Sequence, residues 1–301
     1  MGIEFSLVWL LIHLLRLPPR SLARRMGEGV AWLAWILLPR LRRVGMRNLE
    51  LGFPEKNKSE REQILRRLYR TLGWQLAEFC QMSKYTPKSA ARFIEYDGLE
   101  RYLAAKKKAT ERKSGVLVVT GHLGAWELSS FYHSLAGHPM GMVIRRLDNP
   151  MVDRLVNRIR CLHDNFVMHK DDFARALLGA MRSGSTVGIL MDTNMTPPQG
   201  VFVPFFGIPA CTASGLARVA LKTNAVVLPG CLMWDTARRK YILNFGEEIE
   251  LVRTEDAEAD IVANTALFTQ AIEGYVRRYP EQWLWVHRRW KTRPAGEPPL
   301  Y

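Results

Sequence analysis

The feature that most limits the fold of this chain is an alternation of short apolar runs with helical patterns. Apolar runs with strand character end near Thr120, Arg145, Asp192 and Met233. Between them lie stretches with helical spacing, such as NPMVDRLVNRIRCLH and DDFARALLGAMRSG. This alternation predicts an α/β fold in which a sheet is covered by helices.

Polar side chains follow several of these predicted strands. His122, Arg145 and Asp192 each lie at or just past the end of an apolar run. In open α/β sheets, ligands bind beyond the carboxyl ends of the strands. We therefore expect these three residues to share one edge of the sheet.

The segment VLVVTGHLGAWEL places His122 five positions before Glu127. On a continuous helix these side chains would diverge by about 140°. They meet more easily if His122 lies in the Thr-Gly turn and Glu127 in the first turn of the following helix. A histidine held by a carboxylate is a general base, and the alternative is a structural turn histidine. No G-x-S-x-G motif is present, so the attacking hydroxyl is expected to be the substrate's own.

Two apolar runs, GIEFSLVWLLIHLLRL and GVAWLAWILL, lie within the first fifty residues. Neither reaches the roughly 20 apolar residues of a membrane-crossing helix. Arginines flank both runs, and Trp9, Trp32 and Trp35 lie within them. This favours a hydrophobic helical membrane anchor in residues 1–45 that dips into an anionic cytoplasmic leaflet or barely crosses it. The alternative is a pair of ordinary amphipathic helices packed on the remaining domain, residues 46–301.

A third segment, SEREQILRRLYRTLGWQLAEFCQMS, predicts a helix over residues 59–83. Its first four residues match a capping signature. The apolar residues expected along one face of this helix are Ile64, Leu68, Leu72, Leu76 and Phe79.

The overall charge indicates an anionic partner. The chain has 43 Lys+Arg against 29 Asp+Glu, a formal net charge of +14, which suits phospholipid, nucleic acid or an acidic protein. Four cysteines, Cys80, Cys161, Cys211 and Cys231, lie far apart without ligand spacing. We expect them to be reduced core residues, and we expect no metal and no cofactor.

At GHLGAWE the chain resembles the bacterial lipid A late acyltransferases, a branch of the lysophospholipid acyltransferase superfamily marked by His-x4-Asp/Glu. Three further blocks carry the resemblance: VIRRLDNPMVDRLVNRIR, MDTNMTPPQGVFVPFFGIPACTASGLARVA and PEQWLWVHRRWKTRP. The resemblance covers nearly the whole chain, including the hydrophobic N-terminus. One departure is Asp192-Thr193-Asn194, where family members commonly read Asp-Gln-Asp.

The resemblance implies a lysophospholipid acyltransferase-like mixed sheet and transfer of an acyl group from a thioester, on acyl carrier protein or coenzyme A, to a hydroxyl of a lipid A precursor. It also implies a site at the cytoplasmic face of the bacterial inner membrane, with residues 46–301 as the catalytic domain. His122 would take the proton and Glu127 would orient the imidazole.

The resemblance assigns binding roles to three further residues. Arg145 and Arg160 are expected to bind phosphates of the acceptor or of the donor's phosphopantetheine. Arg160 alternatively braces the oxyanion, and either arginine is alternatively a solvated charge. Asp192 is expected to position these arginines.

Two segments allow two interpretations each. In the C-terminal block, Trp283, Trp285 and Trp290 alternate with basic residues, which resembles a nucleic-acid stacking surface. With an anchor in the same chain we expect a bilayer interface there instead, and no nucleic acid. The run VFVPFFG forms either an acyl groove or core.

Two other functions compete with the main hypothesis. One is an acyltransferase of the same superfamily that acts on another polar lipid, a phosphatidylinositol mannoside or a lysophospholipid. The other is a basic membrane-surface binding protein without catalysis.

Overall fold

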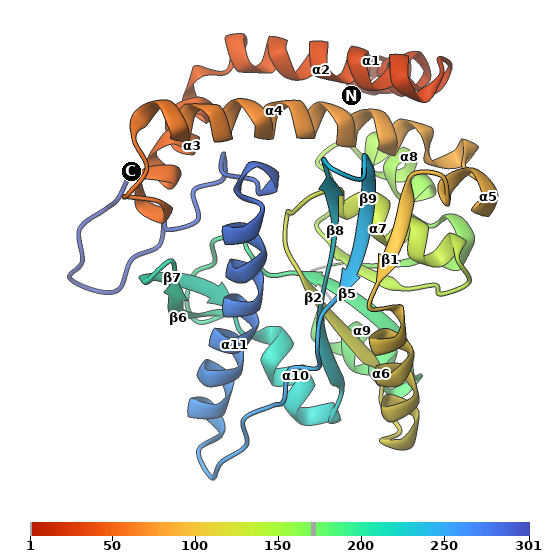
Figure 1. Cartoon of the computed structure of the whole chain (residues 1–301). Coiled ribbons are helices and arrows are strands. Elements are labelled where there is room, and N and C mark those ends of the chain that lie inside the picture. The colour runs from red at the N-terminus through yellow and green to blue at the C-terminus, as the bar shows by residue number, and fades with distance from the viewer. Residues whose placement is uncertain (1, 170–172) are drawn as a thin grey trace.

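A computed structural model of the chain describes residues 2–169 and 173–301 (Figure 1). Its centre is a seven-stranded sheet in the order β1-β9-β8-β2-β5-β3-β4, and β6 and β7 form a separate two-stranded sheet. The strands are β1 (Ile94–Asp97), β2 (Val116–Thr120), β3 (Gly141–Ile144), β4 (Phe166–His169), β5 (Thr186–Leu190), β6 (Gly200–Phe205), β7 (Ile208–Ala213), β8 (Val226–Asp235) and β9 (Lys240–Phe245).

Among the residues that the structure describes, β8 and β9 pair antiparallel and the other strand pairs of the large sheet are parallel. The sheet is therefore mixed and mostly parallel, and the prediction of an α/β fold flanked by helices is confirmed. The predicted strand ends also agree with β2, β3, β5 and β8 to within two residues.

Helices cover both faces of the sheet (Figure 1). The helices are α1 (Gly2–Arg16), α2 (Arg20–Leu37), α3 (Pro39–Gly52), α4 (Lys58–Gln81), α5 (Pro87–Ala90), α6 (Leu99–Glu111), α7 (Trp126–Leu135), α8 (Pro150–Arg160), α9 (Phe173–Arg182), α10 (Gly215–Thr223) and α11 (Ala257–Arg278). The core that includes Leu117 and Val119 of β2 is shared with α9, α10 and α11. Val116 and Val118 belong to the other core, shared with α6 and α7. The four-residue apolar run of β2 is thus buried on both faces, as expected for a central parallel strand.

The long helix α4 lies across the top of the sheet in Figure 1. Its capping box is formed by Asn57 and Glu60, whose backbone and side chains bond reciprocally, so the helix begins one residue before the predicted Ser59. The buried apolar residues in the N-terminal half of α4 are Leu65, Leu68 and Tyr69. Because β8 runs toward α4 in the figure and β2 is parallel to β8, the carboxyl end of β2 lies on the α4 side.

The N-terminal helices form a layer on top of α4. Helices α2 and α4 cross closely at Gly27 and Gly73, where a Cβ on either residue would collide with the other's backbone. Among the described residues, none of the helices combines the length and apolarity that a bilayer crossing requires. The exposed large apolar side chains of α1 and α2 and of the turn after each are Ile3, Leu7, Trp9, Leu10, Leu14, Leu17, Leu22, Met26, Trp32, Leu33, Ile36, Leu37 and Leu38.

The C-terminal tryptophans correct one prediction. Trp283, Trp285 and Trp290 are among the largest fully buried side chains, and Arg289 between them is buried too. These rings pack on one another and on Phe205, with Trp283 and Trp285 at 4.5 Å in an edge-on arrangement. The expected bilayer interface at this segment is therefore wrong for the tryptophans, because they complete the core.

The VFVPFFG run is buried in part. Val203 and Phe205 are buried in β6, and Phe206 follows them. All four cysteines are free, and three of them are buried while Cys161 is half-buried.

Candidate active site

The turn between β2 and α7 carries His122. Two glycines shape this turn. A Cβ at Gly121 would touch the Asp192 carboxyl group, and Gly124 has a φ of +52° where a Cβ would overlap the carbonyl of Leu232. Only glycine adopts such a conformation without strain at that spacing. The turn therefore brings the His122 backbone directly against Asp192.

Asp192 lies beyond the end of the neighbouring strand. Thr120 of β2 pairs in register with Leu190 of β5. His122 and Asp192 each lie two residues beyond this pair, so they are side by side. One carboxylate oxygen of Asp192 lies 2.8 Å from His122 Nδ1. The other accepts from the His122 backbone N–H at 2.7 Å and from Trp283 Nε1 at 2.8 Å.

The two groups shift each other's pKa. Burial raises the pKa of Asp192, but the charge of His122 and hydrogen bonds from His122 and Trp283 outweigh it and lower the pKa to about 2. Burial lowers the pKa of His122, but the charge and hydrogen bond of Asp192, with the charge of Glu127, leave it raised. Because an ionised Asp192 can only accept, the neutral form of His122 carries its proton on Nδ1 and leaves Nε2 free to accept one.

Glu127 lies in the first turn of α7 and contacts a different partner. Arg160, the last residue of α8, donates to it from Nε at 2.9 Å and from Nη2 at 2.5 Å. This is a two-pronged guanidinium–carboxylate pair. Burial lowers the pKa of Arg160, but the hydrogen bonds and charge of Glu127 leave it raised. The carboxylate at His122 Nδ1 is thus Asp192, and Glu127 acts on His122 through its charge.

The structure brings together four of the five predicted site residues: His122, Asp192, Glu127 and Arg160. Arg145 follows β3 at the same edge of the sheet but contacts none of these four among the described residues; its exposed side chain pairs with the exposed Asp148 at 3.3 Å. Asp192 holds His122 and Trp283, whereas the sequence analysis expected it to position the arginines.

The C-terminal segment fixes the His122 turn from the other side. Leu123 and Trp283 form an antiparallel bridge, and the Leu284 N–H donates to the His122 carbonyl at 3.1 Å. The Gly124 N–H donates to the Gln282 carbonyl at 2.8 Å. The imidazole of His122 also meets the Trp126 ring edge-on, with ring centroids 5.3 Å apart.

Sequence reasoning missed Trp283 as a member of the site and missed Asp192 as the partner of His122. A signal for Asp192 was present, since both residues follow apolar runs by the same short interval and neighbouring parallel strands end together. No comparable signal exists for Trp283, because its contact depends on how the C-terminal segment returns across the sheet.

A mostly parallel sheet with a carboxylate-held histidine beyond its central strands defines an α/β enzyme. The chain belongs to the bacterial lipid A biosynthesis acyltransferase family, whose model matches residues 2–292, and is an acyltransferase of lipid A biosynthesis.

Several relatives are similar to this chain over most of their length. The chain is 29% identical over 307 residues to the lipid A biosynthesis palmitoleoyltransferase of Escherichia coli (strain K12), covering 95% of this chain and 96% of the relative. It is 28% identical over 305 residues to the lauroyltransferase of the same organism, covering 98% and 92%. It is 23% identical over 256 residues to the myristoyltransferase of that organism, covering 85% and 77%.

Proposed function

We propose that this enzyme transfers an acyl group from an acyl carrier protein thioester to a hydroxyl of a lipid A precursor, with His122 as the general base. The observation that carries the proposal is the buried Asp192 carboxylate, which accepts three hydrogen bonds, two of them from His122. This arrangement fixes the tautomer that leaves Nε2 free to accept a proton.

The reaction follows from that geometry. His122 Nε2 takes the proton of the acceptor hydroxyl as its oxygen attacks the thioester carbonyl carbon. The charge of Asp192 stabilises the imidazolium that forms. As the carbon–sulfur bond breaks, Nε2 returns the proton to the leaving thiolate, so the histidine is regenerated without an acyl-enzyme intermediate.

Glu127 and Arg160 act as a pair in this proposal. The ion pair keeps the Arg160 guanidinium at the start of α7, near His122, where it meets the oxyanion or a phosphate of a substrate. Glu127 positions that arginine and also favours the charged imidazole. Arg145, on its exposed loop, is proposed to bind a phosphate of the acceptor or of the donor's phosphopantetheine.

We further propose that residues 1–45 face the cytoplasmic leaflet of the bacterial inner membrane and that residues 46–301 form a lysophospholipid acyltransferase-like catalytic domain. The exposed apolar side chains of α1 and α2 support this proposal, since monomeric soluble proteins rarely expose so many large apolar side chains on one layer. The helices lie on the α4 side, the side on which β2 ends, so α1 and α2 are at the same end of the sheet as the turn that carries His122 (Figure 1).

A reconstituted transfer assay tests the proposal. Purified protein is given an acyl carrier protein thioester or acyl coenzyme A together with a lipid A precursor, and the product is identified by mass spectrometry. The wild type is expected to use the carrier protein thioester, and His122→Ala is expected to lose at least about 10³-fold in kcat. His163→Ala serves as the matched control, because His163 lies outside the site in the turn after α8.

Three results would contradict the proposal. Full turnover by His122→Ala would exclude His122 as the general base. A covalent acyl-enzyme trapped in a rapid quench contradicts direct transfer. Transfer to a lysophospholipid or a phosphatidylinositol mannoside, with none to the lipid A precursor, contradicts the acceptor.

A further inference from the structure

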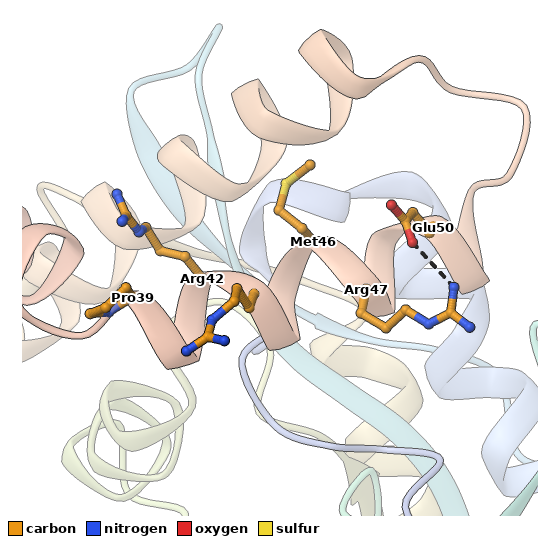
Figure 2. A pocket seen from close by; sticks show the side chains of 6 residues that line it. Pro39, Arg42, Met46, Arg47 and Glu50 are labelled. Carbon is orange, nitrogen blue, oxygen red and sulfur yellow. Dashed lines mark hydrogen bonds and ion pairs between the residues drawn. The ribbon is translucent and has the colours of Figure 1, made fainter. Parts of the chain in front are cut away.

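A groove between α3 and the C-terminal end of the chain gathers positive charge. Its cavity volume is about 390 Å³, and its lining includes Arg40, Arg43, Arg47, Arg288 and Tyr301. We call these four arginines and Tyr301 the α3 groove. A second hollow adjoins it on the same helix and shares Arg43 and Arg47, and Figure 2 shows side chains of α3 lining that hollow.

The arginines of the α3 groove have little counter-charge. Among residues 2–169 and 173–301, no carboxylate lies within ion-pair distance of Arg40, Arg43 or Arg288. Arg47 pairs with Glu50 at 3.2 Å, the contact drawn in Figure 2, and both side chains are exposed. Three guanidinium groups without a counter-ion around one cavity repel each other, and an anion that enters the cavity offsets this repulsion.

The α3 groove is held in shape by buried contacts. Asn48, which is fully buried, donates to the carbonyls of Trp285 and His287 at 2.5 and 2.6 Å. The Tyr301 hydroxyl donates to Asn48 and accepts from the Trp290 N–H. Arg288 lies over the Tyr301 ring, 5.7 Å from its centroid. The walls are therefore pre-organised, which distinguishes the α3 groove from a set of mobile surface arginines.

The α3 groove also adjoins the exposed apolar layer. Leu33, Ile36, Leu37 and Leu38 are exposed at the end of α2, and α3 with its arginines begins at the next residue, Pro39. When apolar side chains of an interfacial helix enter the acyl boundary, the adjoining turn lies at the depth of the lipid phosphates. This position selects a lipid headgroup over an anion that diffuses in from solution.

We propose that the α3 groove binds the phosphate of an anionic phospholipid in the membrane on which α1 and α2 lie. The guanidinium forks match phosphate oxygens in two-pronged geometry, which an ammonium group does not. The α3 groove shares no lining residue with the acyl-transfer site; its assignment rests on the proposed membrane position of α1 and α2 and not on the identity of the acyl donor or acceptor.

Vesicle partitioning tests the proposal. Full-length protein is sedimented with phosphatidylcholine vesicles, alone or with phosphatidylglycerol. In the triple variant Arg40→Gln, Arg43→Gln, Arg288→Gln, binding to the phosphatidylglycerol vesicles is expected to fall on the order of a hundredfold, roughly five-fold per arginine near the surface. Binding to pure phosphatidylcholine is expected to stay unchanged. The corresponding triple lysine variant is expected to recover only part of the loss.

The matched control removes the same charge elsewhere. Lys113, Arg182 and Lys222 are exposed and precede β2, β5 and β8, so they lie at the amino ends of neighbouring strands, away from α4. A strand of five residues spans about 17 Å, more than the roughly 10 Å Debye length at 0.1 M salt. The triple glutamine variant of these residues is expected to lose less than about threefold.

Three results would overturn the proposal. The first is an equal loss in the two glutamine variants, and the second is full binding by the lysine variant. The third is loss of acyl carrier protein binding with vesicle binding unchanged, which would assign the α3 groove to a protein. Circular dichroism checks folding. Arg43→Gln alone serves if the triple variant unfolds, because the exposed side chain of Arg43 makes no ion pair among the described residues.

Discussion

The His122 site and the α3 groove both contain several charged side chains. At the site these charges are paired, whereas three arginines of the α3 groove have no ion-pair partner among the described residues. At the site both carboxylates have partners. Asp192 is buried and accepts three hydrogen bonds, and Glu127 accepts a bidentate pair of hydrogen bonds from Arg160. In the α3 groove, Arg40, Arg43 and Arg288 line an open cavity without a carboxylate at ion-pair distance among the described residues.

The difference indicates what each region does. Paired, buried charges fix the position and protonation of the groups that perform chemistry. Removing one partner leaves the other charge buried without a counter-ion. Unpaired arginines around a preformed cavity contribute little to folding and keep their full binding capacity for an anion. Substitutions at the site should therefore reduce catalysis and stability, whereas substitutions in the α3 groove should reduce lipid binding alone.

The largest effect is expected at Asp192. Asp192→Asn keeps the shape of the side chain but removes the charge and allows the wrong tautomer of His122, so kcat should fall on the order of 10³- to 10⁴-fold. Glu127→Gln should cost less, on the order of 10²-fold, since it acts through Arg160. Single-turnover measurements with the carrier thioester compare the two variants, and a larger loss in Glu127→Gln than in Asp192→Asn would reverse the assignment of the two carboxylates.

The Glu127–Arg160 pair should behave as one unit. Because each side chain is mostly buried, Glu127→Gln leaves a charge without its partner and should lower the free energy of unfolding by about 2 kcal/mol. The double variant Glu127→Gln, Arg160→Met should be no less stable than Glu127→Gln alone. Urea denaturation of the wild type, the two single variants and the double variant gives the free energies of unfolding for this double-mutant cycle. Additive losses of stability would show that the two residues act separately.

Trp283 is expected to have a smaller, selective effect. Trp283→Phe removes one donor from Asp192 and should lower the free energy of unfolding by about 1–3 kcal/mol and kcat about tenfold. Trp285→Phe is the matched control, because its indole donates to the Pro280 carbonyl and not to the site. It should lose similar stability while kcat changes less than about twofold. Equal kcat values for the two variants would exclude a positioning role for Trp283.

The smallest effect on stability is expected in the α3 groove. Arg40→Gln, Arg43→Gln and Arg288→Gln remove repulsion and no ion pair, so together they should change the free energy of unfolding by less than about 0.5 kcal/mol, upward at low salt. Urea denaturation at low and high salt measures this. A loss comparable to that of Glu127→Gln would mean that these arginines serve the fold.

Much of the fold could be predicted from the sequence because its strands are central and parallel. The run that forms β2 is apolar on both faces, and the predicted ends of β2, β3, β5 and β8 agree with the structure to within two residues. The helix predicted over residues 59–83 is α4, displaced by one or two residues because Asn57 supplies the cap in place of Ser59.

The aromatic segments show where sequence reasoning fails. Trp9 and Trp32 near the N-terminus and Trp283 and Trp285 near the C-terminus lie in similar mixtures of aromatic and basic residues. The first two are exposed and the last two are buried. Composition cannot separate these outcomes, because burial depends on which segment returns across the sheet.

The sequence singled out four residues that the structure brings together, but it predicted neither their pairing nor the contact with Trp283. A spacing such as His-x4-Glu suggests that the partner of His122 is close in sequence. The register of β2 with β5 instead places Asp192, seventy residues away in sequence, beside His122.

Nitrogen-15 NMR of histidine-labelled protein, titrated with pH, tests the central claim most directly, with the His122 signal assigned by its loss in His122→Gln. Because Asp192 outweighs burial, the neutral ring should carry its proton on Nδ1, and its pKa should lie above the ordinary value of about 6.5. In Asp192→Asn the lowering by burial should prevail and the pKa should fall. A neutral ring protonated on Nε2, or a pKa that does not move in Asp192→Asn, would contradict the account.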